Sequence, residues 1–168
     1  MRSEIGRWLT ASATILLALA CTSQSARADD CRVWTTGLMF PAYSFSQDSA
    51  DKAVGTIGYL CMGEKTGLEI GIELSGGNSG NPLHRYMTNG ESHLNYNIFL
   101  NGDSSETFGD GIQGMRFTRY LPASASAVTK DGLKIGGTVT ILGLVFRHQN
   151  VAAGSYSDNL VATITIDH

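Results

Sequence analysis

The chain has 168 residues, enough for one domain with a proper core. Its formal net charge of −3 argues against nucleic acid or an anionic membrane as the partner, because both select basic proteins. Glycine occurs 20 times and turn dipeptides recur, while no segment sustains the periodicity of an amphipathic helix.

Residues 1–28 are predicted to be a secretory signal peptide. Arg2 and Arg7 make the start basic, and the apolar run 8–20 is too short to span a bilayer. Residues 26–28 read Ala-Arg-Ala, a typical cleavage signal. We therefore expect the chain to be exported.

Cleavage after Ala28 would start the mature protein at Asp29 and leave residues 29–168 as a single domain. This part has 9 Lys and Arg against 14 Asp and Glu, so the mature protein is more acidic than the whole chain. Two alternatives stay open, namely lipidation at Cys21 and retention of the apolar run as an anchor. We expect no stable insertion in a membrane.

Cys31 and Cys61 are predicted to form one disulfide. Two cysteines in an exported chain most simply pair with each other. The bond would close a loop of about 31 residues and stabilise the fold by roughly 3.5 kcal/mol in the chain-entropy model. A metal site or a pair of reactive thiols has less support, because the chain has no C-x-x-C motif and no histidine at ligand spacing.

Short runs of β-branched and aromatic residues alternate with turns along the mature chain. The predicted strands are residues 33–40, 53–62, 68–74, 94–100, 137–146 and 155–168. Turns are predicted at Asn89-Gly90, Asn101-Gly102, Asp110-Gly111 and Asp131-Gly132, and a long exposed loop at 120–135. Regular short strands separated by turns predict an all-β fold, in particular a β-sandwich.

The C-terminal stretch carries the clearest pattern. Its even positions are mostly apolar and its odd positions mostly polar, which predicts a strand with one buried face. Because the chain ends on this strand, we expect it to lie at a sheet edge with unpaired backbone groups.

Several motifs fail on their context. Residues 109–114 fit G-x-G-x-x-G, but a β-like run follows them instead of a helix, so a turn is predicted. The triplet 102–104 resembles an esterase block within a turn. The four histidines lack ligand spacing, and the nearby acidic residues Asp103, Glu106 and Asp110 lack the EF-hand spacing for calcium. We therefore predict no catalytic site, metal site or cofactor.

Motifs along the whole mature chain carry a family resemblance. They are Cys31–Val33, Leu38–Phe40 with Tyr43, Leu60–Cys61, Arg85–Met87, Leu94–Asn101, Phe108–Gly111 and Val151–Ile166. Together they resemble the spore coat protein U domain family, which includes the subunits of archaic chaperone–usher pili.

The resemblance implies an immunoglobulin-like sandwich that lacks its last strand. In pilus subunits, a periplasmic chaperone fills the gap first, and the N-terminal extension of the next subunit fills it later by β-augmentation. The implied partners are a periplasmic chaperone, an outer-membrane usher and other pilus subunits. The implied location is the cell surface or a pilus, reached through the periplasm.

The expected acceptor groove has two walls. One wall would be Leu160, Ala162, Ile164 and Ile166, and the other Trp34, Leu38 and Phe40. The parity of the first strand breaks between Val33 and Leu38, which predicts a bulge near Gly37.

The chain departs from a rod subunit of this family in one respect. A rod subunit has a donor strand of alternating apolar residues before its first cysteine, whereas Asp29 and Asp30 alone would precede Cys31 here. We therefore expect a structural, adhesive subunit that accepts a strand without donating one, at the tip or in a minor position. The alternatives are a free-standing secreted coat or surface domain and, with less support, a small exported hydrolase.

Overall fold

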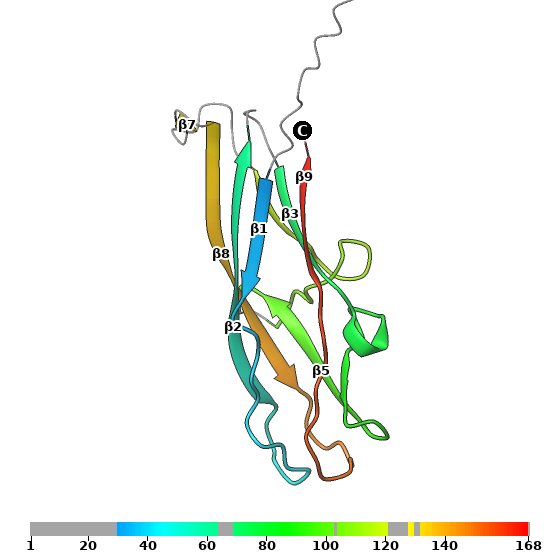
Figure 1. Ribbon diagram of the computed structural model, residues 1–168. Helices are drawn as coiled ribbons and strands as arrows, with labels where there is room; N and C mark the ends of the chain where they lie inside the picture. Colours follow the sequence, from blue (N-terminus) through cyan, green and yellow to red (C-terminus); the bar gives the residue numbers. More distant parts are fainter. Residues whose placement is uncertain (1–29, 64–68, 103, 121–127, 130–131, 168) are drawn as a thin grey trace, which may run out of the picture.

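A computed structural model describes residues 30–63, 69–102, 104–120, 128–129 and 132–167. The predicted signal peptide and its cleavage site lie outside these residues. The strands are β1 (Asp30–Thr35), β2 (Asp51–Gly63), β3 (Glu69–Leu74), β4 (Tyr86–Thr88), β5 (His93–Leu100), β6 (Phe117–Tyr120), β7 (Val128–Thr129), β8 (Gly132–Val145) and β9 (Ala162–Asp167). A 3-10 turn, η1 (Gly77–Ser79), completes the regular structure and forms part of a loop between β3 and β4. The prediction of an all-β fold is confirmed (Figure 1).

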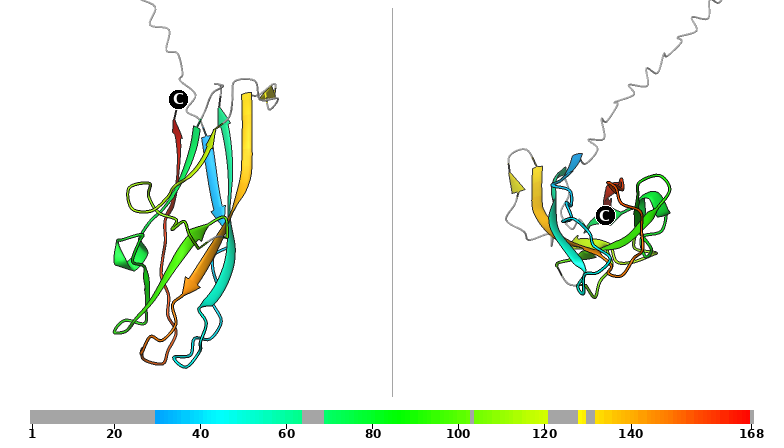
Figure 2. Two further views of the ribbon diagram at one scale, coloured as in Figure 1. Left: turned by 180° about the vertical axis from the view of Figure 1, so that it is seen from behind. Right: turned by 90° about the horizontal axis from the view of Figure 1, so that it is seen from below.

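The strands form two antiparallel sheets. The larger sheet has the order β1-β2-β8-β5-β4, with β7 added beside β8, and the smaller has the order β6-β3-β9. The two sheets curl around a common interior, as the view along the long axis makes plain (Figure 2). The edge strands β1 and β9 consequently face each other across one side of the sandwich.

Alternating side chains from both sheets fill the interior. In β3 the apolar residues Ile70, Ile72 and Leu74 are buried, while Glu69 and Glu73 point outward, as the alternation in the sequence predicts. The larger sheet adds its own inward residues, which are Ile57, Tyr59, Cys61, Tyr96, Ile98, Val139, Ile141 and Val145. The core therefore lies between the two sheets along their whole length.

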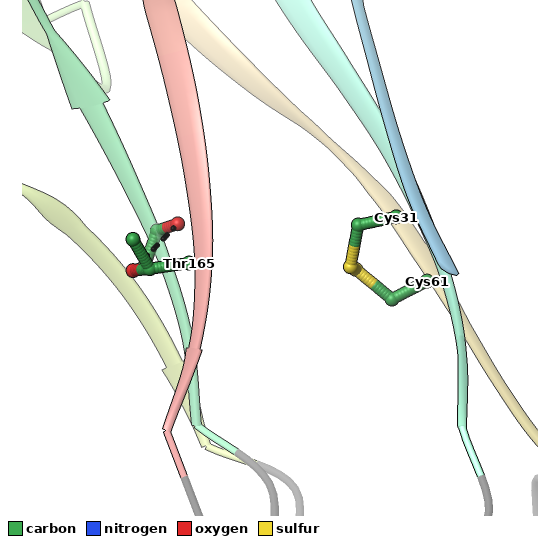
Figure 3. Close-up of a disulfide and its surroundings, with 4 residues drawn as sticks. Cys31, Cys61 and Thr165 are labelled. Carbon is green, nitrogen blue, oxygen red and sulfur yellow. Dashed lines mark hydrogen bonds between the residues drawn. A yellow bond between two sulfur atoms is a disulfide. The ribbon is translucent and has the colours of Figure 1, made fainter. Parts of the chain in front are cut away.

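The disulfide between Cys31 and Cys61 is present, so this prediction is confirmed. The two residues lie directly opposite each other in the pairing of β1 with β2. The bond projects from the larger sheet toward β9, whose Thr165 points away from it and donates to the carbonyl oxygen of Gly71 at 3.5 Å (Figure 3). The disulfide thus fixes the edge strand β1 to β2, its one neighbour in the sheet among the described residues.

The bounds of two strands differ from the prediction. β1 ends at Thr35 instead of residue 40, because Gly37 adopts a left-handed backbone with a φ of 71° and turns the chain out of the sheet. β8 begins at Gly132, inside the stretch 120–135 that was predicted to be a loop. Its long pairing with β2 extends into this stretch, as far as Leu133, although the Ala and Ser residues around Pro122 favour a loop.

The C-terminal strand is also shorter than predicted. β9 begins at Ala162, and residues 155–161 are not part of either sheet. In this stretch the chain changes partners, because Ser157 bridges to Thr88 on β4 whereas Val161 bonds to Ser75 just after β3. The apolar alternation continues through the change, which is why the sequence predicted one strand.

Candidate binding groove

The two sheets meet along two sides, and one of these sides is closed by hydrogen bonds. Residues 106–115 run between β5 and the smaller sheet and pair with both. Phe108 N donates to Ile98 O at 2.8 Å, and Leu74 N donates to Gly109 O at 3.0 Å. We call this side the closed seam.

A turn at the G-x-G-x-x-G motif shapes the closed seam. The Asp110 carboxylate accepts hydrogen bonds from Gln113 N at 2.6 Å and Ile112 N at 2.9 Å. These bonds favour the ionised form, so they lower the pKa of Asp110. The segment 109–114 is therefore a turn, as predicted, and holds no phosphate-binding helix N-terminus.

The opposite side, between β1 and β9, is an open seam. The two strands lie side by side, yet neither pairs with the other, since β1 pairs with β2 and β9 with β3 among the described residues. Side chains from both strands, such as Val33 and Ile164, pack against the shared core. Apolar packing therefore joins the two strands here.

Beyond the ends of these two strands the open seam widens into a cavity of about 650 Å³. Its first wall is the segment 35–43 and its second wall is the segment 154–162. Core residues form its floor, among them Ile57, Leu74, Met87, Tyr96, Ile98 and Ile141. We call this cavity with its two walls the groove.

Four of the predicted groove residues line it. Leu38 and Phe40 belong to the first wall, and Leu160 and Ala162 belong to the second. All four are partly buried against the core. The structure therefore brings these residues together from the two ends of the domain.

The other three predicted residues do not line the groove. Ile164 and Ile166 are partly buried on β9, opposite Ile72 and Ile70, and belong to the core next to the groove. Trp34 lies on the outer face of β1 and is 55% exposed, with its indole ring over Gly58.

The outward position of Trp34 follows from the alternation of side chains in β1, before the irregular backbone at Gly37. In β1 the odd-numbered Cys31 and Val33 face the core, so the even-numbered Trp34 faces outward. The left-handed turn at Gly37 reverses this parity, and the even-numbered Leu38 and Phe40 then face inward. The irregularity predicted near Gly37 is present. Trp34 lies before it and faces outward, so it does not join Leu38 and Phe40 in the groove as predicted.

Gly55 on β2 and Gly143 on β8 leave room for the first wall. A Cβ atom added to Gly143 would lie 2.5 Å from the Phe40 ring, and one added to Gly55 would lie 2.5 Å from Gly37 O. Contacts this short do not occur between real atoms, so a larger residue at Gly55 would collide with backbone, and one at Gly143 would require the Phe40 ring to shift. Sequence reasoning missed this role, although both residues stand in strands where glycine is otherwise unfavourable.

Unpaired backbone groups face the groove from the first wall. Within the described part of the chain, no hydrogen bond involves the backbone of residues 38–42. Residues 39, 41 and 42 are exposed, Met39 to 92%, so the backbone of this segment is accessible to an incoming chain. Apart from Pro41, which has no N–H group, each of these residues offers one donor and one acceptor.

The second wall has the same property for a geometrical reason. Ser157 exchanges two backbone hydrogen bonds with Thr88, and Val161 accepts one from Ser75 N, all on the side away from the groove. Consecutive residues of an extended chain direct their backbone groups to opposite sides. Asp158 and Leu160, which alternate with these residues, therefore direct theirs toward the groove.

A buried cation supports the floor from behind. Arg85 is fully buried, and its guanidinium donates to carbonyl oxygens of Leu74, Ser75 and Pro82 and to the side chain of Asn97. Burial lowers the pKa of Arg85 to about 10. The sequence contained Arg85 only as part of a family motif, and no local pattern indicated that it is buried.

The groove combines an apolar floor with polar side chains in its walls. The floor is apolar apart from the Tyr96 hydroxyl, and the walls include the polar side chains of Thr35, Tyr43, Ser155, Tyr156, Ser157 and Asp158. Within the described ranges, His, Cys, Asp and Glu form no group of three that could hold a metal ion. The same part of the chain includes no helix that is long and apolar enough to cross a membrane.

Comparisons with known proteins agree with this geometry. The family model described as Spore Coat Protein U domain matches residues 10–163, a match that begins inside the predicted signal peptide. No curated protein sequence matches the chain.

A solved structure shares the fold. It is the CsuC–CsuE chaperone–tip adhesion subunit pre-assembly complex from archaic chaperone–usher Csu pili of Acinetobacter baumannii. The match has a TM-score of 0.53 and 20% sequence identity, and it covers 82% of this chain and 40% of that chain. This chain therefore spans about two fifths of the length of its solved relative, and the likeness at this identity concerns the fold.

Proposed function

The chain belongs to the Spore Coat Protein U domain family, and from this premise we propose that it is a secreted structural subunit of an archaic chaperone–usher pilus. In this proposal the groove accepts a strand from another protein. The observation that carries it is the open seam, where a cavity of about 650 Å³ lies between two walls with unpaired backbone groups.

An inserted strand would satisfy both requirements of the groove at once. Its backbone would pair with residues 38–42 on one side and with the alternate residues of the second wall on the other. Its apolar side chains would cover the floor, each contributing about 1.5 to 3 kcal/mol on burial. The sum is comparable to the whole stability of a typical domain.

The proposed partners follow from this use of the groove. They are a periplasmic chaperone, an outer-membrane usher and other pilus subunits, and the route is export through the periplasm to the cell surface. The solved relative is a complex of a chaperone with a tip adhesion subunit, which supports a chaperone as partner. On the same ground we propose a tip or minor position in the pilus.

A pair of neighbouring substitutions tests the proposal. Leu160 lines the groove, whereas Val161 is 64% exposed and lies on the other face of the same segment. A synthetic peptide with alternating apolar residues, long enough to span the first wall, should bind the protein and raise its Tm. Leu160→Asp should abolish this binding, because it places a carboxylate in the apolar groove, and Val161→Asp should leave it intact.

Other outcomes would decide against the proposal. A protein that is monomeric and highly stable alone, and that binds no such peptide, would be a self-contained secreted coat or surface domain. Equal loss of peptide binding in both variants would place the peptide elsewhere than in the groove.

A further inference from the structure

Tyr96 touches both walls of the groove. It lies in β5 on the floor and is 3% exposed. Its ring packs edge-on against Phe40 of the first wall, with 5.9 Å between the ring centroids. Its hydroxyl donates to Oδ2 of Asp158 in the second wall at 2.7 Å. One side chain thus spans the groove.

Asp158 is itself held in place from outside the groove. Its Oδ1 accepts hydrogen bonds from Asn78 N at 2.7 Å and Asn159 N at 2.8 Å, and the Asn78 side chain donates to Ser157 O at 3.0 Å. The carboxylate packs so closely on Gly77 that a side chain there would collide with it. The middle of the second wall is therefore fixed to the turn η1 mainly through one carboxylate.

The floor beneath Tyr96 is equally constrained. Tyr96 N donates to Arg85 O at 3.1 Å, and the neighbouring Asn97 accepts from the Arg85 side chain at 2.9 Å. Tyr96 is therefore held in one position, from which it contacts both walls.

We infer that Tyr96 and Asp158 are positioning residues that set the distance between the two walls before a strand arrives. An empty apolar groove tends to close, because closure would remove apolar surface from water. A ring contact to one wall and a charge-assisted hydrogen bond to the other oppose this closure. The groove is thereby preorganised for a strand, and preorganisation strengthens binding chiefly by reducing the conformational entropy that is lost on binding. This inference rests on the proposed function.

The test compares two tyrosine variants. Tyr96→Phe keeps the ring and its contact with Phe40 but removes the hydrogen bond to Asp158. Tyr59→Phe is the matched control, because Tyr59 is also 3% exposed and packs against another ring, that of Phe117, but does not line the groove. The first readout is the association rate constant of the alternating apolar peptide with the full protein. The second is the exchange of the backbone amides of residues 154–161 in the protein without peptide, measured by mass spectrometry.

We expect Tyr96→Phe to slow association about tenfold, which corresponds to the loss of one hydrogen bond to a charged group. We also expect faster amide exchange in the second wall, since Asp158, which accepts from Asn159 N, loses the hydrogen bond that ties it to the floor. Tyr59→Phe should change neither quantity.

The inference is overturned if the two variants behave alike, because their effect would then be general loosening of the structure. It is also overturned if Tyr96→Phe folds and leaves both readouts unchanged. If the wild-type protein binds no peptide, the proposed function fails, and amide exchange alone then decides whether Tyr96 fixes the walls.

Discussion

Arg85 and Asn97 meet inside the sandwich, where Nη1 of the arginine donates to Oδ1 of the asparagine at 2.9 Å. Arg85 is 0% exposed and Asn97 is 4% exposed. Asn97 in turn donates to Leu83 O at 3.0 Å, so the pair joins β5 to the loop that precedes β4. A buried cation is costly unless its donors are satisfied, and here carbonyl and amide oxygens satisfy them.

Substitution of Arg85 by methionine should destabilise the fold strongly. Arg85→Met would leave the buried oxygens of Leu74, Ser75 and Asn97 without their donors, at a cost of about 1–3 kcal/mol for each unsatisfied group. We expect the free energy of unfolding, measured with a denaturant, to fall by at least about 3 kcal/mol. Arg147→Met is the control, since Arg147 is exposed and donates one bond, to Asp48 O. Equal effects of the two substitutions would contradict the role of Arg85.

The turn in the closed seam should make stability depend on pH. The pKa of Asp110 is lowered in the folded protein, so its ionised form stabilises the fold above its unfolded pKa of about 3.9. This contribution disappears as the pH falls through the lower, folded pKa. Asp110→Asn should therefore lower the Tm at neutral pH, and its difference from wild type should shrink toward about pH 3.

A second acidic residue provides the control for this experiment. Asp48 is exposed and lies outside the closed seam. Asp48→Asn should leave the Tm close to wild type at neutral pH. A difference between Asp110→Asn and wild type that stays constant over the whole pH range would exclude the ionised carboxylate as the cause.

Removal of the disulfide should lower the stability of the fold without changing its topology. The bond joins residues 30 positions apart in sequence, so the double variant Cys31→Ala, Cys61→Ala should lose roughly 3.5 kcal/mol in the chain-entropy model. Because β1 pairs with one strand, β2, among the strands that the structure describes, amide exchange should increase more in β1 than in β8. Uniform exchange along the chain would argue against a specific role in fixing the edge strand.

The contact between Gly143 and Phe40 of the first wall can be tested with a compensating substitution. Gly143→Ala should displace the Phe40 ring and lower the Tm, because the added Cβ atom has no room. In that background Phe40→Leu removes ring atoms from the contact and should restore part of the loss. The test is the coupling free energy between the two substitutions in a double-mutant cycle. Additive effects of the two substitutions on stability would mean that the residues do not touch.

The sequence predicted the features that depend on local pattern. Alternation located β3 and the buried face of β9, and two cysteines in the mature part of the chain left one intramolecular pairing. Turn dipeptides located the turn at Asp110. These signals act over a few residues, so a single sequence contains them.

Features that depend on distant contacts were missed. The sequence predicts the parity break near Gly37, but the packing of Cys31 and Val33 on the core, which leaves Trp34 facing outward, is evident only in the fold. Burial of Arg85 depends on carbonyl groups ten and eleven residues away. β4 and β7 have three and two residues and are too short to show a period.

The closed seam also limits how many neighbours the domain can have. Residues 106–115 already pair with β5 and with β3, so the closed seam has no free strand position for an incoming chain. Among the described residues, unpaired backbone next to a groove lies on the open seam, on the other side of the sandwich. In the proposed assembly, the described part of the domain would therefore accept one strand, and the fibre would not branch at this subunit.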